Sequence, residues 1–214
     1  MQASIQKTID FVQKTLANAE AGHDWFHIER VFKTALTINE QEKGDEQVVA
    51  FAALLHDIAD PKFNNGDEDL GPNIAESFLV SIAIDPQTIA HVKLIIQNMS
   101  FKNSFDGDRF TSKEMEIVQD ADRLDAIGAI GIARAFTYGG FKNRVLYDPE
   151  IKPETHLTKE TYKNTTAPTI DHFYEKLLLL KDLMNTEAGS AIAAERHQFM
   201  LLYLDHFYKE WDGK

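Results

Sequence analysis

The chain has 214 residues, of which 43% are hydrophobic and 26% charged, so its composition is that of a globular protein and not of a disordered one. Its 34 acidic and 22 basic residues give a formal net charge of −12. This balance argues against wrapping of nucleic acid and against binding to an anionic membrane, because both need a positive surface. The chain has no cysteine, which excludes disulfide scaffolds, thiolate zinc sites and cysteine nucleophiles.

The first 20 residues read as an amphipathic segment without the apolar stretch of a signal peptide, and no run approaches the roughly 18 apolar residues of a membrane span. We therefore expect a cytoplasmic protein that does not enter membranes. One core can still serve ~200 residues, and no linker is visible. We expect a single domain over 1–214, with a core at about 20–136 and C-terminal helices at about 158–211.

Apolar residues recur at spacings of three and four much more often than they alternate, which predicts an all-α fold. Asp45 suits the cap of one helix and Pro86 the first turn of another. In chain order, the expected helices cover residues 4–19, 24–41, 46–59, 72–84, 86–98, 112–136, 170–184 (a core-facing stripe of Ile170, Phe173, Tyr174, Leu177, Leu180, Leu183 and Met184), and a last helix carrying Ile192, Phe199, Leu202, Tyr203 and Trp211. Residues 60–71 and 138–165 read as long loops, which in compact domains are usually functional or mobile.

The pair His56-Asp57 ends the apolar run from Val48 to Leu55. Two strongly polar side chains at the end of a buried helix need partners, because an unpaired buried charge costs several kcal/mol. A solvent-facing pair at the end of the helix is the alternative. His56 and Asp57 are therefore the first candidates for a site.

Two further segments carry histidine or clustered acids. His23 and His27 lie one helical turn apart near Arg30, and Asp122 belongs to an acidic stretch that precedes Gly128. Helical glycine costs roughly 1 kcal/mol against alanine, so the glycines after this stretch indicate close packing of the backbone. Packing alone would also explain that segment.

Taken together, His27, His56, Asp57 and Asp122 form a mixed imidazole and carboxylate set on three helices. Such a set suits one divalent ion among Mn, Ni, Fe, Zn and Mg, and two imidazoles favour a transition metal. Four protein ligands would leave positions open on an octahedral ion, which indicates chemistry and not a structural site.

The order His27, then His56-Asp57, then Asp122 within Ala121-Asp122-Arg123-Leu124 resembles the HD-domain metal-dependent phosphohydrolase superfamily. The longer strings around these residues, and a tail at 173–177, resemble its YedJ- and YpgQ-like bacterial branch over essentially the whole chain. The resemblance implies a compact single-domain helical bundle of the HD-domain type, a divalent metal and hydrolysis of a phosphate ester or anhydride. YpgQ-like members act as nucleoside triphosphate pyrophosphohydrolases. Two-metal relatives add two histidines before the final aspartate, and only His91 falls there, so one metal is favoured.

For catalysis we expect Asp57 and Asp60. Asp60 lies one turn beyond His56, and several HD hydrolases use an acid three residues past the motif aspartate as general acid or base; its alternative role is to end the helix before Pro61. An anionic substrate is expected to meet basic or polar side chains near the ligands. The candidates are Arg123 and Arg30, then Lys142, Arg144 and Lys176, with His23 and Asp24 orienting His27 or touching substrate. A structural ion pair for Arg30 and packing of the Lys176 stem are the alternatives.

The expected partner is an anionic small molecule, a nucleotide, and the oligomeric state is left open. A monophosphate phosphatase or phosphodiesterase and a non-catalytic metal-binding helical domain are the alternative functions. A guanosine tetraphosphate hydrolase is disfavoured, because those relatives carry a Glu-Asp pair where this chain has Asp60-Pro61.

Overall fold

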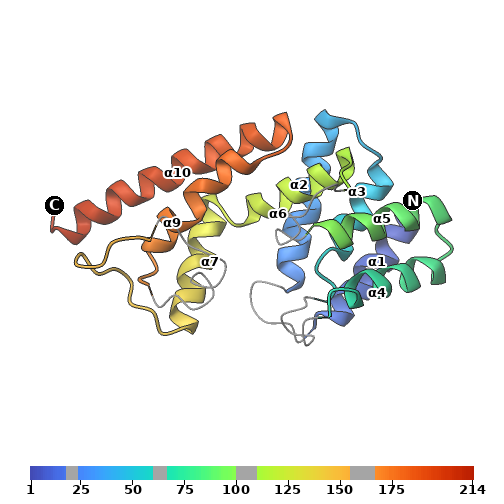
Figure 1. Ribbon diagram of the computed structural model, residues 1–214, viewed down its shortest axis with the longest axis horizontal. Coiled ribbons are helices and arrows are strands. Elements are labelled where there is room, and N and C mark those ends of the chain that lie inside the picture. Colours follow the sequence, from blue (N-terminus) through green and yellow to red (C-terminus); the bar gives the residue numbers. More distant parts are fainter. Residues whose placement is uncertain (18–23, 60–66, 100–109, 155–166) are drawn as a thin grey trace. The chain divides into compact units, whose positions relative to one another are not determined.

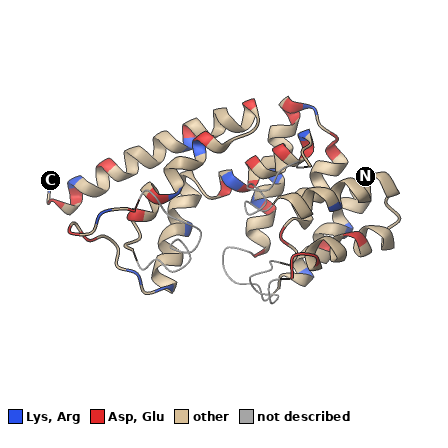
Figure 2. Ribbon diagram, viewed as in Figure 1, with Lys and Arg blue, Asp and Glu red and all other residues tan. Residues whose placement is uncertain are grey.

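The computed structural model describes residues 1–17, 24–59, 67–99, 110–154 and 167–214. Within these ranges the regular structure is helical and contains no strand, which confirms the all-α class. The chain divides into two compact units, Met1–Asp122 and Arg123–Lys214. Among the described helices, none is long and apolar enough to cross a membrane. Acidic and basic residues are interspersed along the helices of both units (Figure 2).

The first unit is built around α3, whose residues from Val48 to Leu55 are all buried. A helix that is apolar all round must be covered on several sides, and α3 packs against α1, α2 and α5, while α4 packs against α5 (Figure 1). The bounds in this unit are α1 Gln2–Thr15, α2 Trp25–Glu42, α3 Glu46–Leu55, α4 Leu70–Ser81, α5 Pro86–Asn98 and α6 Lys113–Asp125, the last of which runs to the start of the second unit.

Side-chain caps mark the start of α3 and of α5. The Asp45 carboxylate accepts hydrogen bonds from the N–H groups of Gln47 at 2.9 Å and Val48 at 3.2 Å, as predicted. Asp85 caps α5 in the same way, and Pro86 is the first residue of that helix. Such a cap contributes typically ~1 kcal/mol to the stability of its helix.

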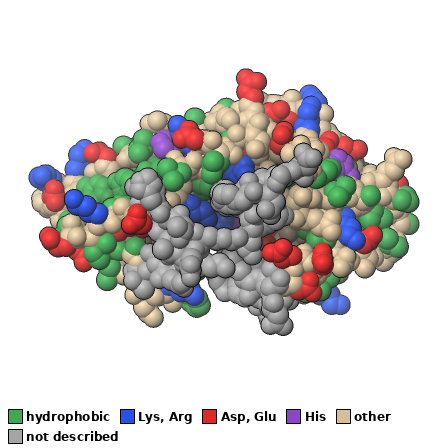
Figure 3. All heavy atoms as spheres, in the orientation of Figure 1, with side chains coloured by type: hydrophobic (Ala, Val, Ile, Leu, Met, Phe, Trp, Pro, Cys, Tyr) green, Lys and Arg blue, Asp and Glu red, His purple; other side chains and the backbone are tan. Residues whose placement is uncertain are grey.

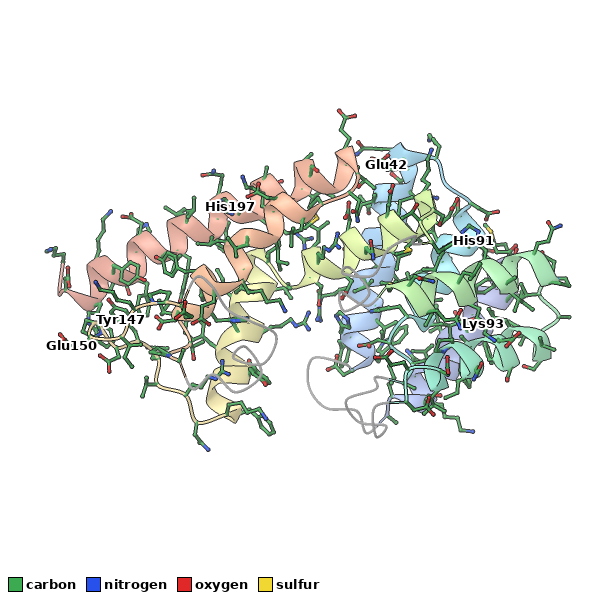
Figure 4. All side chains as sticks on the ribbon, viewed as in Figure 1. Glu42, His91, Lys93, Tyr147, Glu150 and His197 are labelled. Atoms are coloured by element: carbon green, nitrogen blue, oxygen red, sulfur yellow. The ribbon has the colours of Figure 1, made fainter. Side chains whose placement is uncertain are left out.

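The described part of the second unit contains α7 (Gly128–Phe141), α9 (Asp171–Glu175), the 3₁₀ helix η3 (Leu177–Leu183) and the long α10 (Glu187–Trp211), which packs against α7 and η3. Phe173 stacks on Tyr203 with ring centroids 5.9 Å apart. At the end of α6, the buried Asp125 pairs with Arg134, and Arg196 donates to the Leu124 carbonyl. Tyr147, from the segment after α7, packs against the aromatic C-terminal end of α10 (Figure 4).

The prediction of a single helix over 112–136 was wrong, because the chain turns between α6 and α7. Gly128 has φ +74°, a left-handed conformation that glycine adopts without strain. At Gly131, a Cβ atom would lie 2.2 Å from the Ala126 carbonyl oxygen, so the backbone passes too close for any side chain. The two glycines thus permit a tight corner, which apolar periodicity alone does not reveal.

Two other expected helices are shorter than predicted. The helix of 46–59 ends at Leu55, and residues 56–59 form turns. The stripe of 170–184 is divided at Lys176, with φ −146° and ψ −56°, into α9 and η3. Leu177, Leu180 and Leu183 repeat every three residues, which is the period of a 3₁₀ helix. The strict spacing of three was therefore the signal for η3.

Candidate metal centre

Asp24 and His27 form the first turn of α2. Asp24 is the N-cap residue, and its carboxylate accepts a hydrogen bond from the His27 backbone N–H at 3.0 Å. The His27 side chain is only 3% exposed. The cap therefore fixes the backbone that carries a buried imidazole, whereas a contact between Asp24 and substrate stays a prediction.

His56 terminates α3 and is oriented by that helix. Its Nδ1 lies 2.9 Å from the Ala53 carbonyl oxygen, and a carbonyl can only accept, so Nδ1 carries the proton of this hydrogen bond. In the neutral imidazole, Nε2 is then an acceptor. This Nε2 is buried and has no hydrogen-bond partner within the described ranges. The helix end thus presents an unsatisfied nitrogen lone pair.

Asp122, on α6, brings a carboxylate to both imidazoles. Its Oδ1 lies 3.5 Å from His27 Nε2 and 3.9 Å from His56 Nε2, and the two rings meet edge to face with centroids 5.5 Å apart. Ligand atoms of His27, His56 and Asp57 all lie within 4.8 Å of one another. The first unit therefore brings together four side chains, of which the first and the last are 95 residues apart in the sequence.

A positive charge would stabilise this cluster electrostatically. A buried acceptor nitrogen and a carboxylate oxygen cannot satisfy each other, and buried polar atoms are rarely left without a partner. A cation among them would satisfy both, and the mixed nitrogen and oxygen set suits a borderline divalent ion. The imidazoles are nearly inaccessible, at 3% and 6% exposure, whereas the Asp122 side chain is 44% exposed. Solvent therefore reaches the cluster at Asp122.

The other predicted site residues are distributed over both units. Arg30 is half-buried on α2 in the first unit. His23 and Asp60 lie outside the described residues, so their expected roles stay predictions. In the second unit, Arg123 donates a hydrogen bond to the Leu183 carbonyl, and Lys176 is exposed. The Lys142 ammonium lies 5.2 Å from the centre of the Phe141 ring. The Arg144 guanidinium lies 5.6 Å from the centre of the Tyr138 ring.

His91 has a place in the packing of the first unit. Its Nε2 lies 2.9 Å from Ser112 Oγ and 3.6 Å from Glu114 Oε2, so it joins α5 to the start of α6 (Figure 4). Burial acts to raise the pKa of the Glu114 carboxyl, but the N–H groups of Asp45 and Glu114 and the charge of His91 lower it overall. These contacts account for His91 without any role in the metal cluster.

Sequence reasoning missed a group of buried acids in the second unit. Asp171 is buried, and its Oδ2 has no hydrogen-bond partner among the described residues. Burial, followed by the charges of Glu175 and Asp148, raises the pKa of Asp171 to about 6. Burial also raises the pKa of Glu175. Acids four residues apart within the apolar stripe of 170–177 were the available signal.

Comparison with known proteins gives a consistent result. The HD domain family matches residues 25–127, a range that contains His27, His56, Asp57 and Asp122. YpgQ of Bacillus subtilis is 38% identical over 209 residues, which cover 95% of this chain and 91% of YpgQ.

Solved structures extend the similarity over the whole chain. An HD-superfamily hydrolase from Bacillus thuringiensis is 44% identical, with a TM-score of 0.80 over 100% of this chain and 99% of that one. The structure of Bacillus subtilis YpgQ in complex with ADP is 36% identical, with a TM-score of 0.74 over 96% of this chain and 97% of that one. By these similarities, the chain belongs to the HD-domain family.

Proposed function

We propose that this protein is a divalent-metal-dependent phosphohydrolase that acts on nucleotides as a nucleoside triphosphate pyrophosphohydrolase. The observation that carries the proposal is the buried, unsatisfied Nε2 of His56 beside the Asp122 carboxylate and the His27 imidazole. The Bacillus thuringiensis relative is described as an HD-superfamily hydrolase, which supports hydrolysis as the reaction. The ADP complex of YpgQ supports a nucleotide as substrate.

In this proposal His27, His56, Asp57 and Asp122 hold one ion. Two imidazole ligands favour Mn, Ni, Fe or Zn over Mg. When bound, a divalent ion supplies Lewis-acid activation of water and neutralises charge on a phosphoryl group. The Ala53 carbonyl keeps the Nε2 of His56 available as a ligand, because it holds the ring proton on Nδ1.

Proton transfer and substrate binding are assigned to the other residues that the sequence singles out. Asp60, three residues beyond Asp57, is proposed to exchange a proton with the attacking water or the leaving group, with Asp57 as a second carboxylate near the reaction. Arg123 and Arg30 are proposed to bind phosphate oxygens, since a guanidinium can donate two parallel hydrogen bonds to them. Lys142, Arg144, Lys176, His23 and Asp24 are weaker candidates for contact with the substrate.

The proposed reaction adds one water across the α–β anhydride bond of a nucleoside triphosphate. The water oxygen bonds to the α-phosphorus, pyrophosphate leaves with the bridging oxygen, and a nucleoside monophosphate is the second product. Hydrolysis at the γ-phosphorus would instead release orthophosphate and a diphosphate. Identification of the phosphorus products therefore distinguishes the two reactions directly.

The test is a screen of ribo- and deoxyribonucleotides with Mn or Mg, with the products identified by phosphorus NMR. We expect pyrophosphate and monophosphate from the wild type and no turnover from His56→Ala. His197→Ala, which removes a half-buried histidine on α10 (Figure 4), is the matched control and is expected to retain activity. Orthophosphate from monophosphates would instead identify a phosphatase, and cleavage of diesters a phosphodiesterase. Metal binding without turnover of any phosphate compound would contradict the enzymatic assignment.

A further inference from the structure

The C-terminal end of α6 is capped by two arginines that come from other helices. The last carbonyl groups of an α-helix have no partner within the helix, and a side-chain donor can satisfy them. Arg196, on α10, donates a hydrogen bond to the Leu124 carbonyl, and Arg134, on α7, donates one to the Asp125 carbonyl at 3.2 Å. We call Arg134 and Arg196 the arginine cap of α6. The cap holds the last turn of α6 from two separate helices.

The arginine cap is part of the packing of the second unit. Several Lys and Arg side chains stand at the molecular surface in Figure 3, whereas Arg134 and Arg196 are both half-buried. Arg134 also pairs with the carboxylate of Asp125, which is only 4% exposed. The stem of Arg196 lies against the corner between α6 and α7, because a Cβ atom at Gly128 would be 2.9 Å from Arg196 Cγ. Packing therefore restrains both guanidinium groups in addition to their hydrogen bonds.

The capped turn of α6 also carries Asp122. Asp122 lies three residues before Asp125, the last residue of α6, and the helix runs without a break between them (Figure 1). The Asp122 side chain is 44% exposed, whereas His27 and His56 are 3% and 6% exposed. Packing thus restrains the carboxylate less than it restrains the two imidazoles. The position of the carboxylate consequently depends on the backbone of this turn.

Without the cap, the turn would not hold this carboxylate accurately. Helix ends fray, and opening of the last turn of α6 would include the backbone of Asp122. The Asp122 Oδ1 lies 3.5 Å from His27 Nε2 and 3.9 Å from His56 Nε2. Distances between a metal ion and its ligands vary by only about 0.2 Å. A small displacement of the turn would therefore be enough to weaken a shared ion.

From these contacts we infer that the arginine cap positions Asp122 for binding a divalent ion, so that Arg134 and Arg196 are positioning residues of the metal centre. The inference rests on the proposed function, because it takes Asp122 as a ligand. Both arginines and the carbonyls that they bind belong to the second unit, and they act through the backbone of α6. Groups that hold metal ligands in place typically contribute roughly 10- to 100-fold to metal affinity. Loss of the cap should therefore weaken metal binding in a protein that is still folded.

The dissociation constant for Mn, measured by titration of the metal-free protein, tests the inference without an activity assay. Arg196→Met removes the hydrogen-bond donor but keeps an unbranched stem against Gly128, and it should weaken Mn binding roughly 10- to 100-fold. Arg196→Lys keeps a donor and should recover most of the affinity. Lys209→Met is the matched control, because it removes a cation from an exposed position of the same helix, and it should bind Mn as the wild type does. Circular dichroism verifies that each variant is folded.

The possible outcomes separate the inference from the proposed function. A folded Arg196→Met variant that binds Mn as tightly as the wild type would overturn the inference and leave the metal centre intact. An equal loss of affinity in Lys209→Met would also overturn it, because the effect would then come from the loss of a positive charge and not of the cap. A wild type that binds no Mn would refute the metal centre itself, and the inference with it.

Amide hydrogen exchange of the metal-free protein is a second test, which does not depend on the folding of a variant. If the arginine cap holds the last turn, the amides of residues 122–125 in the wild type should exchange as slowly as those of Ile117 and Val118, in the middle of α6. The same amides should exchange faster in Arg196→Met. Rapid exchange of residues 122–125 in the wild type would contradict the inference, because the last turn would then open despite the cap.

Discussion

Replacement of Asp171 by asparagine isolates the cost of a buried carboxylate in the second unit. Asparagine has the same shape but cannot ionise, and Asp171 is buried with an Oδ2 that has no hydrogen-bond partner among the described residues. Burial, with the charges of Glu175 and Asp148, raises the pKa of Asp171 from 3.8 to about 6. The folded protein therefore holds this proton more tightly than the unfolded chain does.

The sign and size of the effect follow from that difference. Below pH 3.8 the Asp171 carboxyl is protonated in both the folded and the unfolded state, so it does not lower the free energy of unfolding. Above about pH 6 it is ionised in both states, and the full cost of burying the charge lowers the free energy of unfolding. Stability is lost as the pH rises between these values. A rise in pKa from 3.8 to about 6 corresponds to about 3 kcal/mol. The free energy of unfolding of Asp171→Asn, relative to that of the wild type, should thus increase by about 3 kcal/mol as the pH rises from 4 to 8.

Urea denaturation of both proteins across this pH range measures the difference in unfolding free energy. The difference at each pH cancels titrations that the two proteins share. Asp182→Asn, at an exposed aspartate, is the control and should follow the wild type at every pH. A difference between Asp171→Asn and wild type that does not change with pH would refute the reasoning, since it would mean that Asp171 titrates alike in the folded and unfolded states.

Three further predictions concern the proposed site and the α6–α7 corner. Asp60→Asn should retain metal and melting temperature but lose roughly 10²- to 10⁴-fold in kcat, the usual contribution of general acid–base catalysis; unchanged kcat with retained metal would reject this role. Arg123→Ala should raise KM for a nucleotide by roughly 10- to 100-fold, which is the contribution of a charged hydrogen bond. If the variant is instead destabilised and has normal kinetics, the main function of Arg123 is its hydrogen bond to the Leu183 carbonyl. Gly128→Ala should lower the unfolding free energy by at least about 1–2 kcal/mol, because a Cβ there would lie 2.9 Å from Arg196 Cγ at positive φ; Gly140→Ala, with nothing within 4 Å, should cost nothing in the same urea titration.

The helical class and most helices could be predicted from the sequence, because the signal is local. α5 matches its expected bounds, since Asp85 and Pro86 mark its start and apolar residues mark its face. The corner at Gly128 could not be predicted in this way. Apolar spacing continues through it, and the side chain that lies closest to Gly128, Arg196, comes from a helix far along the chain.

The candidate site was predictable to a different degree. His56-Asp57 stood out because polar residues interrupt an apolar run, and His27 and Asp122 were added by the resemblance to a known pattern as much as by chemistry. The sequence could not indicate that the Ala53 carbonyl fixes the His56 tautomer, because that contact depends on the last turn of α3. The burial of Asp171 was missed although it lies in an apolar stripe, because an acid near a helix start is more often a solvent-exposed cap.

The most direct test of the proposed metal centre is the metal content of the purified protein. The wild type, loaded with Mn and dialysed, is compared with His56→Ala by elemental analysis, with His197→Ala as the control and circular dichroism to verify folding. One equivalent of metal in the wild type and in His197→Ala, and none in His56→Ala, is the predicted result. A folded wild type that retains no metal, or a His56→Ala variant that retains as much as wild type, would contradict the assignment of His27, His56, Asp57 and Asp122 as ligands.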